Sequence, residues 1–299
     1  MALVIDNLSK TYANGTQALK SVSLTIPKGM FGLLGPNGAG KSSLMRTIAT
    51  LQDADTGSIF LDDLDVLREK EAVRRVLGYL PQEFGVYPRV SAEELLDHLA
   101  VLKGIANKGE RKAIVEALLQ QTNLWNARKK NLGGYSGGMK QRFGIAQALL
   151  GNPRLIIVDE PTAGLDPAER NRFHNLLSEI GENIIVILST HIVSDVTDLC
   201  RNMAIISQGQ VRLTGDPLTV MEQLRGQVWC KLVSKDEVAA LQAQYHVISS
   251  RLFAGQTIVH VLSDYRPDSG FEEVNPDLED VYFAQISESN KKKELSTGY

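Results

Sequence analysis

The sequence predicts an α/β protein with a parallel sheet flanked by helices, an inserted helical subdomain and a small C-terminal α+β appendage. Short apolar runs alternate with helical patterns over residues 1–225, as expected for a parallel sheet. Strand signals are missing at about residues 83–150, where the patterns are helical. Strand-like segments return around one helix in residues 226–299. We therefore expect two domains, divided at residue 225, with the helical subdomain inside the first.

Composition limits the possible functions. The chain has 299 residues, of which 43% are hydrophobic and 22% charged, typical of a globular protein of about two domains. Its net charge of −3 favours no nucleic-acid partner, because such proteins usually have a basic surplus. We expect no signal peptide, and no apolar run approaches the ~18–20 residues that span a bilayer. Cys200 and Cys230 are expected to be buried thiols in a reducing cytosol.

The first elements are expected to be a strand pair and a strand that leads into a glycine loop. The dipeptide Asn14-Gly15 predicts a hairpin, and apolar residues alternate over residues 22–26 in the manner of a strand. Residues 30–34 form a short apolar run before the glycines, and residues 41–51 have a helical pattern after them.

Four later apolar runs each end in a polar residue. The runs end at Gln82, Glu160, His191 and Ser207. Because open α/β sheets bind ligands outside the carboxyl ends of their strands, we expect these ends to face a common site.

The helical subdomain and the appendage have clear boundaries in the sequence. Ser91 and Glu94 form a capping box at the start of a helix, and residues 108–122 predict another helix. A break in the alternating pattern of strands and helices is expected at residues 213–226, before the appendage. The tail, residues 289–299, is expected to be solvated and flexible.

The glycine loop Gly35–Ser42 fits the pattern G-x-x-x-x-G-K-[ST] between a strand and a helix. Its glycines let backbone N–H groups face phosphates, and the helix N-terminus adds a partial positive charge. Lys41 is predicted to reach the β- and γ-phosphates, and the Ser42 hydroxyl to bind Mg²⁺. The residues expected to bind ATP in this loop are Asn37, Gly38, Ala39, Gly40, Lys41, Ser42 and Ser43.

Two acids follow the apolar run that ends at Val158. Asp159 is predicted to emerge at the carboxyl edge of the sheet and to hold Mg²⁺. Glu160 is predicted to be the general base, because a second carboxylate beside bound metal can reach a water molecule. The alternative is a pair of exposed acids at a strand end.

Three single residues are ambiguous by themselves. Gln82 and His191 are either ordinary loop residues or parts of the site, and they become informative because their strands belong to the same sheet as Lys41 and Asp159. Tyr12 is either a core tyrosine or an exposed ring that stacks on adenine, a contact worth about 1–3 kcal/mol in related base–aromatic pairs.

Together these motifs resemble the nucleotide-binding subunits of ABC transporters, which are P-loop NTPases. The resemblance covers residues 1–225 in order and spacing: Tyr12, the Walker A loop, Gln82, YSGGMKQR at 135–142, the Walker B run LIIVDE at 155–160, AGLD at 163–166 and His191. It implies an ABC-type ATPase core that binds ATP and Mg²⁺. In such a core Gln82 binds Mg²⁺ and links it to the helical subdomain, His191 contacts the γ-phosphate, and Asp166 communicates across a dimer interface.

The resemblance also assigns the signature loop, Tyr135–Met139. Ser136 and the backbone N–H groups of Gly137 and Gly138 are implied to cap ATP held by a second subunit, either another copy of the chain or a paralogous subunit. The loop departs from the common Leu-Ser-Gly-Gly-Gln form, because tyrosine replaces leucine and methionine replaces glutamine.

The C-terminal segment NPDLEDVYFAQI, residues 275–286, resembles an element of ABC ATPases that work with separate exporter permeases. This implies an ATPase, or translocase, at the cytoplasmic face of a membrane, bound to integral membrane permease subunits. We expect the permease contact at residues 83–89 of the helical subdomain, because movement at Gln82 is transmitted there. The segment is also compatible with an ordinary amphipathic helix that packs Leu278, Val281 and Tyr282. There are two alternative functions. The chain could be a soluble ABC ATPase that acts on the ribosome or DNA, or an ATP-gated regulator.

Overall fold

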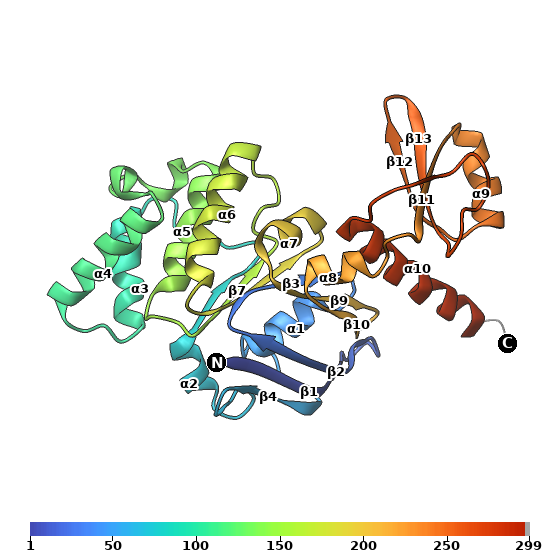
Figure 1. Cartoon of the computed structure of the whole chain (residues 1–299). Helices are drawn as coiled ribbons and strands as arrows, with labels where there is room; N and C mark the ends of the chain where they lie inside the picture. Colours follow the sequence, from blue (N-terminus) through green and yellow to red (C-terminus); the bar gives the residue numbers. More distant parts are fainter. Residues whose placement is uncertain (297–299) are drawn as a thin grey trace. The chain divides into compact units, whose positions relative to one another are not determined.

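Two compact units make up the computed structural model, which describes residues 1–296, with side chains described through Ser287. The first unit spans Met1–Val211 and the second Arg212–Tyr299, so that the division falls inside strand β10 (Gln210–Gly215) (Figure 1). The two-domain division at residue 225 stays a prediction.

A six-stranded sheet with the order β10-β9-β3-β8-β7-β6 forms the centre of the first unit. Its parallel strands are the apolar runs of the sequence: β3 (Gly29–Leu34), β6 (Leu77–Leu80), β7 (Leu155–Asp159), β8 (Ile185–Thr190) and β9 (Asn202–Ser207). Every residue of β7 and β8 is buried, as in parallel strands covered on both faces.

A second, antiparallel sheet has the order β2-β1-β4-β5. Its strands are β1 (Ala2–Thr11), β2 (Gln17–Pro27), β4 (Thr56–Leu61) and β5 (Leu64–Asp65). The predicted β1–β2 hairpin is confirmed, with Gly15 at a φ of 82° in its turn. Sequence analysis missed β4 and β5, because only three consecutive residues of β4 are large and apolar.

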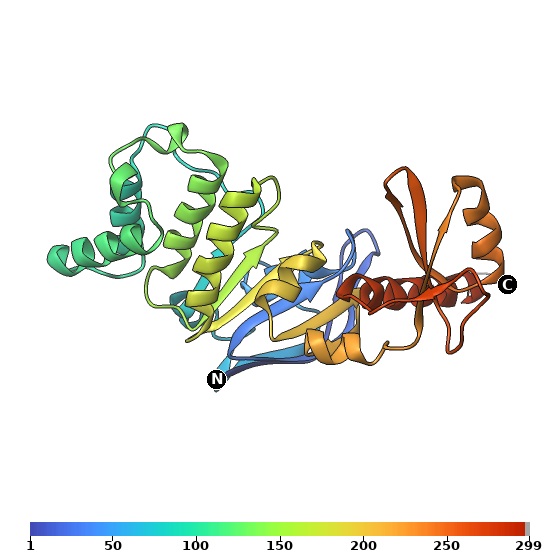
Figure 2. The same cartoon turned by 45° about the horizontal axis from the view of Figure 1, so that its top comes forward.

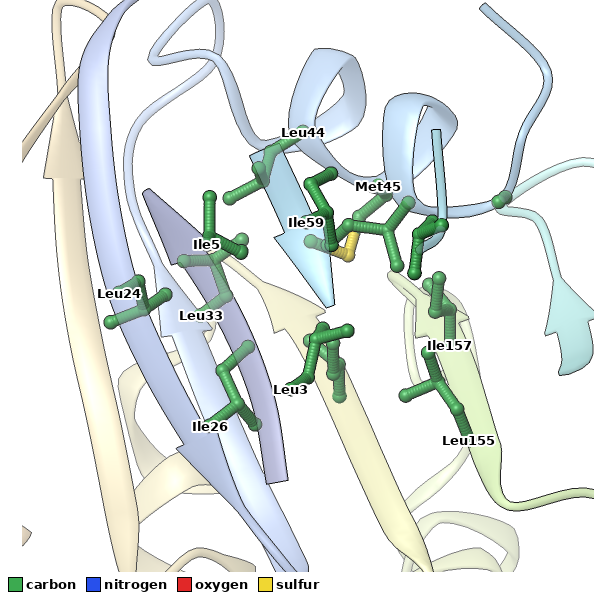
Figure 3. Close-up of a cluster of buried hydrophobic side chains, with 14 of the residues drawn as sticks. Leu3, Ile5, Leu24, Ile26, Leu33, Leu44, Met45, Ile59, Leu155 and Ile157 are labelled. Atoms are coloured by element: carbon green, nitrogen blue, oxygen red, sulfur yellow. The ribbon is translucent and has the colours of Figure 1, made fainter. Parts of the chain in front are cut away.

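Helix α1 (Lys41–Ile48) joins the two sheets into one core. Figure 3 shows its Leu44 and Met45 beside Ile59 of β4 and Ile157 of β7. The core thus fixes the start of α1, which follows the glycine loop. The other helices of this α/β part are α2 (Lys70–Val76), α6 (Pro167–Gly181) and α7 (Val193–Leu199).

The helical subdomain lies between β6 and β7 in the chain (Figure 1). It contains α3 (Ala92–Leu102), α4 (Lys108–Gln121), α5 (Gly137–Leu149) and the 3₁₀ turns Trp125–Ala127 and Leu132–Gly134. The predicted capping box is present, because the Ser91 side chain accepts from the Glu94 N–H and the Glu94 side chain accepts from the Ser91 N–H. Leucines and aromatic residues of these helices form a separate core.

The second unit, drawn in orange and red in Figure 2, has helices beside an antiparallel sheet. The order of its strands is β12-β13-β11-β14. Its elements are α8 (Pro217–Glu222), β11 (Val228–Val233), the 3₁₀ turn Lys235–Glu237, α9 (Val238–Gln244), β12 (Val247–Phe253), β13 (Gln256–Leu262), β14 (Glu272–Glu273) and α10 (Leu278–Ser296). Helix α8, capped by Asp216, occupies the segment where the sequence predicted only a break.

The first turns of helix α10 pack as expected of an amphipathic helix, because Leu278, Val281 and Tyr282 are buried. The tail expected to be flexible begins inside this helix, and its residues 297–299 lie outside the described part of the chain.

Within the described residues, no helix has both the length and the apolar character needed to cross a bilayer. Cys200 is a buried free thiol, as predicted. Cys230 is free but only half-buried, which corrects the prediction of two buried thiols. It lies on β11 opposite Glu272 of the two-residue strand β14, which is itself exposed.

Candidate functional site

A cavity of about 390 Å³ lies at the carboxyl edge of the parallel sheet. Its lining includes Tyr12, the glycine-loop residues 36–43, Gln82, Glu160 and His191. These are the residues that sequence analysis assigned to one ATP site. The fold therefore brings them together as expected from the ends of neighbouring strands.

The glycine loop needs backbone conformations that favour glycine. Gly38 and Gly40 have φ angles of 78° and 109°, in the left-handed region. A Cβ atom on Gly40 would lie 2.6 Å from the carbonyl oxygen of Ala18. The loop therefore turns tightly against β2 and delivers Lys41 to the first position of helix α1.

Lys41 is buried, and its ammonium group bonds to the loop that precedes it. Nζ donates to the carbonyl oxygen of Gly35 at 2.5 Å and to that of Pro36 at 3.4 Å, and it lies 3.8 Å from Oε1 of Glu160. Burial lowers the pKa of Lys41, while the negative charges of Glu160 and Asp159 oppose this shift. A lysine held in this way is positioned for a bound anion.

Glu160 is held between two basic groups. Its Oε2 lies 2.6 Å from Nδ1 of His191, while its Oε1 faces Lys41. Its backbone N–H donates to the carbonyl oxygen of Ser189 at 2.8 Å, and its φ is 49°. A left-handed conformation is unusual for glutamate, and such strain often occurs at functional sites. The Glu160 carboxylate is buried, whereas the His191 side chain is 52% exposed.

The predicted Mg²⁺ ligands have oxygen donors that suit this hard cation. Ser42 offers a hydroxyl and Gln82 an amide oxygen, and both line the cavity. Asp159 offers a carboxylate and is buried beside Glu160 at the end of β7. Magnesium usually keeps several waters and takes few protein ligands, so this donor set fits it.

Tyr12 contacts the glycine loop through its hydroxyl. The hydroxyl lies 2.9 Å from Oγ of Ser43 and donates to Oε1 of Gln52 at 3.1 Å. The residue is 37% exposed and lines the cavity. This position favours an exposed ring beside the nucleotide over a tyrosine of the core.

The signature loop lies elsewhere. Among the described residues that line the cavity, none comes from Ser136–Gly138. Ser136 is exposed and caps α5, because its hydroxyl accepts from the backbone N–H of Met139 at 3.2 Å. A Cβ atom on Gly138 would lie 2.3 Å from Oε2 of Glu169, so α5 and α6 meet closely there. Asp166 is exposed and caps α6.

The two departures from the common signature sequence are accommodated by packing. Tyr135 is buried in the core of the helical subdomain and donates to the carbonyl oxygen of Ala127 at 3.0 Å. Met139 is half-buried against the same core. Both side chains therefore anchor the loop, and Ser136 remains exposed between them.

Sequence analysis missed a turn that closes one wall of the cavity. Gln208 and Gly209 form this turn, and both line the cavity together with Ala18. The Gly209 N–H donates to the carbonyl oxygen of Ala39 at 2.9 Å, and its φ is 78°. The only sequence signal was a glycine after a strand end, which is common in turns without function.

Comparison with known proteins identifies the family. The profile of the family described as "ABC transporter" matches residues 19–163. The protein named "Uncharacterized ABC transporter ATP-binding protein YxlF" of Bacillus subtilis (strain 168) is 33% identical, over 95% of this chain and 99% of the relative. This chain belongs to the ABC transporter ATP-binding proteins. The resemblance inferred from the motifs is thus confirmed, and the chain is an ABC ATPase that binds and hydrolyses ATP.

Other ABC transporter ATP-binding proteins are also similar to this chain in sequence or in fold. The linearmycin resistance ATP-binding protein LnrL of Bacillus subtilis (strain 168) is 33% identical, over 82% of this chain and 80% of the relative. A dimeric, post-hydrolysis structure of the ATP-binding cassette MJ0796 with ADP and Pi has a TM-score of 0.65 and 27% identity, covering 72% of this chain and 98% of that chain. The ABC ATPase cassette fold is therefore shown.

Proposed function

We propose that this ABC ATPase dimerises around two Mg-ATP and drives a separate membrane permease from the cytoplasmic face, with export as the direction of transport. One observation supports the dimer above all. The signature loop exposes Ser136 and the N-terminus of α5 but lies outside the cavity of its own glycine loop. A loop of this kind is suited to phosphate held by another chain.

In the proposed reaction, Glu160 accepts a proton from the water that attacks the γ-phosphate. Its carboxylate is already fixed by His191 and faces Lys41, so little rearrangement is needed. Lys41 and His191 then stabilise the negative charge on the phosphate oxygens. Ser136 of the partner subunit closes the site on the opposite side.

Ser42, Gln82 and Asp159 would hold Mg²⁺, which neutralises phosphate charge. Gln82 is also the second residue of the segment that leads to the helical subdomain, since β6 ends at Leu80 and α3 begins at Ala92. Within this segment Tyr87 is 68% exposed. We place the permease contact at residues 83–89, where a shift of Gln82 reaches the surface through the shortest length of chain.

Two features support export. The segment 275–286 resembles the C-terminal element of exporter ATPases, and the name of one relative, LnrL, includes linearmycin resistance.

The substitution Glu160→Gln tests the proposal. Loss of a general base typically reduces a rate by 10²–10⁴-fold, so we expect turnover to fall by about this factor while ATP binding persists. Slow hydrolysis should trap a dimer with saturating Mg-ATP, visible by size-exclusion chromatography of the chain with its copurified permease. The control is Glu179→Gln, which changes an exposed carboxylate on α6 and should leave both properties unchanged.

Three outcomes would contradict parts of the proposal. Turnover like that of the wild type in Glu160→Gln would remove the general base assignment. A Glu160→Gln protein that stays monomeric with Mg-ATP would exclude the dimer. Recovery of ribosomal components and no membrane protein, in a pull-down from detergent-solubilised membranes, would favour a non-membrane partner.

A further inference from the structure

A buried acid beside the catalytic edge has no role in the reaction described so far. Asp195 on α7 is fully buried. Three side chains from two other parts of the chain converge on its carboxylate: Thr162, Arg170 and His174. A buried carboxylate is stable only with charge compensation and hydrogen bonds, so this cluster is a specific arrangement and not a solvated helix face.

The contacts divide between the two carboxylate oxygens. The Thr162 hydroxyl donates to Oδ2 at 2.6 Å. Oδ1 accepts from Nε of Arg170 at 2.8 Å and lies 2.9 Å from Nε2 of His174. Arg170 provides the compensating charge from α6, and Thr162 provides the only contact in this set that comes from the segment after Walker B.

The positions of these residues in the chain connect the cluster to the catalytic pair. Thr162 follows Glu160 by two residues, with the rigid Pro161 between them. Asp195 lies in the first turn of α7, and its backbone N–H donates to the carbonyl oxygen of Ile192, the residue after His191. The hydrogen bond between Thr162 and Asp195 therefore joins the two segments that present Glu160 and His191.

We propose that Asp195 is a positioning residue of ATP hydrolysis: through Thr162 it fixes His191 and Glu160 at the distance that the reaction needs. Within the described residues, the exposed His191 ring has its own contact with Glu160. Arg170 and His174 extend the same link to α6, whose N-terminus is capped by the exposed Asp166. This inference rests on the roles proposed for Glu160 and His191.

Thr162→Val tests the link, because valine keeps the shape of threonine and removes the hydroxyl while the Asp195–Arg170 pair stays intact. We expect kcat to fall at least about tenfold, with KM for ATP within about twofold of the wild type, as for a group that acts on the chemical step. Thr162→Ser keeps the hydroxyl and should restore most of kcat. Asp195→Asn should show the same split between kcat and KM.

A matched control lies one turn further along α7. Asp198→Asn changes an acid whose side chain is 60% exposed and which lies 4.0 Å from the same histidine, His174; it should leave kcat unchanged. A second measurement follows the imidazole ¹⁵N shifts of His191, one of only five histidines. In Thr162→Val these should move toward values of a solvated ring.

Wild-type kcat together with an unchanged His191 spectrum in Thr162→Val would overturn the inference. Equal losses in Thr162→Val and Thr162→Ser would overturn it too, since the hydroxyl would then not matter. If Asp195→Asn does not fold, Thr162→Val decides alone. Failure of the proposed function is distinguishable, because it would appear as full activity in Glu160→Gln.

Discussion

The two glycine-rich loops of this ATPase differ in how they can treat a phosphate. The loop Gly35–Ser42 has left-handed glycines and a buried lysine of its own, and it lines a cavity. The signature loop has neither: Gly137 and Gly138 have helical backbone without positive φ, and Ser136 faces outward as a helix cap.

The difference indicates that glycine content alone does not define a phosphate site. A loop that encloses its own cation can bind an anion within one chain. A loop that offers only a hydroxyl and backbone N–H groups on an exposed face needs the phosphate to be held by other residues. In this protein the second kind is suited to act on a neighbouring chain.

The largest expected effect is on the affinity of the monomer for ATP, which a change in the first loop should weaken and a change in the signature loop should not. Lys41→Ala should weaken binding by about 2 kcal/mol or more, roughly 30-fold in Kd, because a buried charge contact with phosphate is lost. Ser136→Gly should change the Kd by less than about twofold, and glycine costs the helix cap only a few tenths of a kcal/mol. Titration with a fluorescent ATP analogue at low protein concentration measures both.

A large loss of monomer affinity in Ser136→Gly would show that the signature loop binds nucleotide of its own chain. The comparison between the loops would then fail, whatever the result for Lys41→Ala.

A smaller effect concerns the fit of the signature helix against α6. Gly138→Ala should destabilise the fold by about 1–3 kcal/mol, as overpacking typically does, because the new methyl group meets the Glu169 carboxylate that bonds Arg142 and Arg172. Gly137→Ala is the matched control. No atom lies within 4 Å of its added Cβ, and alanine should stabilise the helix by roughly 0.5–1 kcal/mol.

Urea unfolding measures both changes. Equal stability of the two alanine variants would mean that the signature loop is not packed against Glu169, and that its position is set by the helical subdomain alone.

The smallest effect is the pH dependence of stability that Lys41 contributes. Burial lowers its pKa in the folded protein, so the charged form is penalised while the pH stays below the folded-state pKa. As the pH rises through that value, the folded chain releases the proton before the unfolded chain does, and stability is regained. The stability of the wild type relative to Lys41→Met should therefore increase between neutral and alkaline pH in thermal unfolding without nucleotide.

An equal pH dependence in the two proteins would show that the charges of Glu160 and Asp159 offset the effect of burial on the pKa of Lys41. A loss of relative stability at alkaline pH would show that these charges outweigh burial, as for an ordinary ion-pair partner.

Much of the site could be predicted from sequence, because its residues lie at strand ends that the apolar runs reveal. Glu160 and His191 are of this type, and Lys41 follows the glycine loop that leaves the end of β3. Asp195 could not be found in this way, because an acid in a short polar helix usually faces solvent. Only the packing of α6 against α7 shows that it is buried. Strand β4 has only a short apolar run of its own, and its pairing with β1, which is distant in sequence, supplies what that run does not show.

The bonds from Lys41 to the carbonyl oxygens of Gly35 and Pro36 have a consequence for kinetics. These carbonyl oxygens already hold the ammonium group in place. An arriving phosphate therefore replaces one set of acceptors with another and does not have to order a flexible side chain. Association should then be limited by diffusion into the cavity, and discrimination between nucleotides should appear in their dissociation rates.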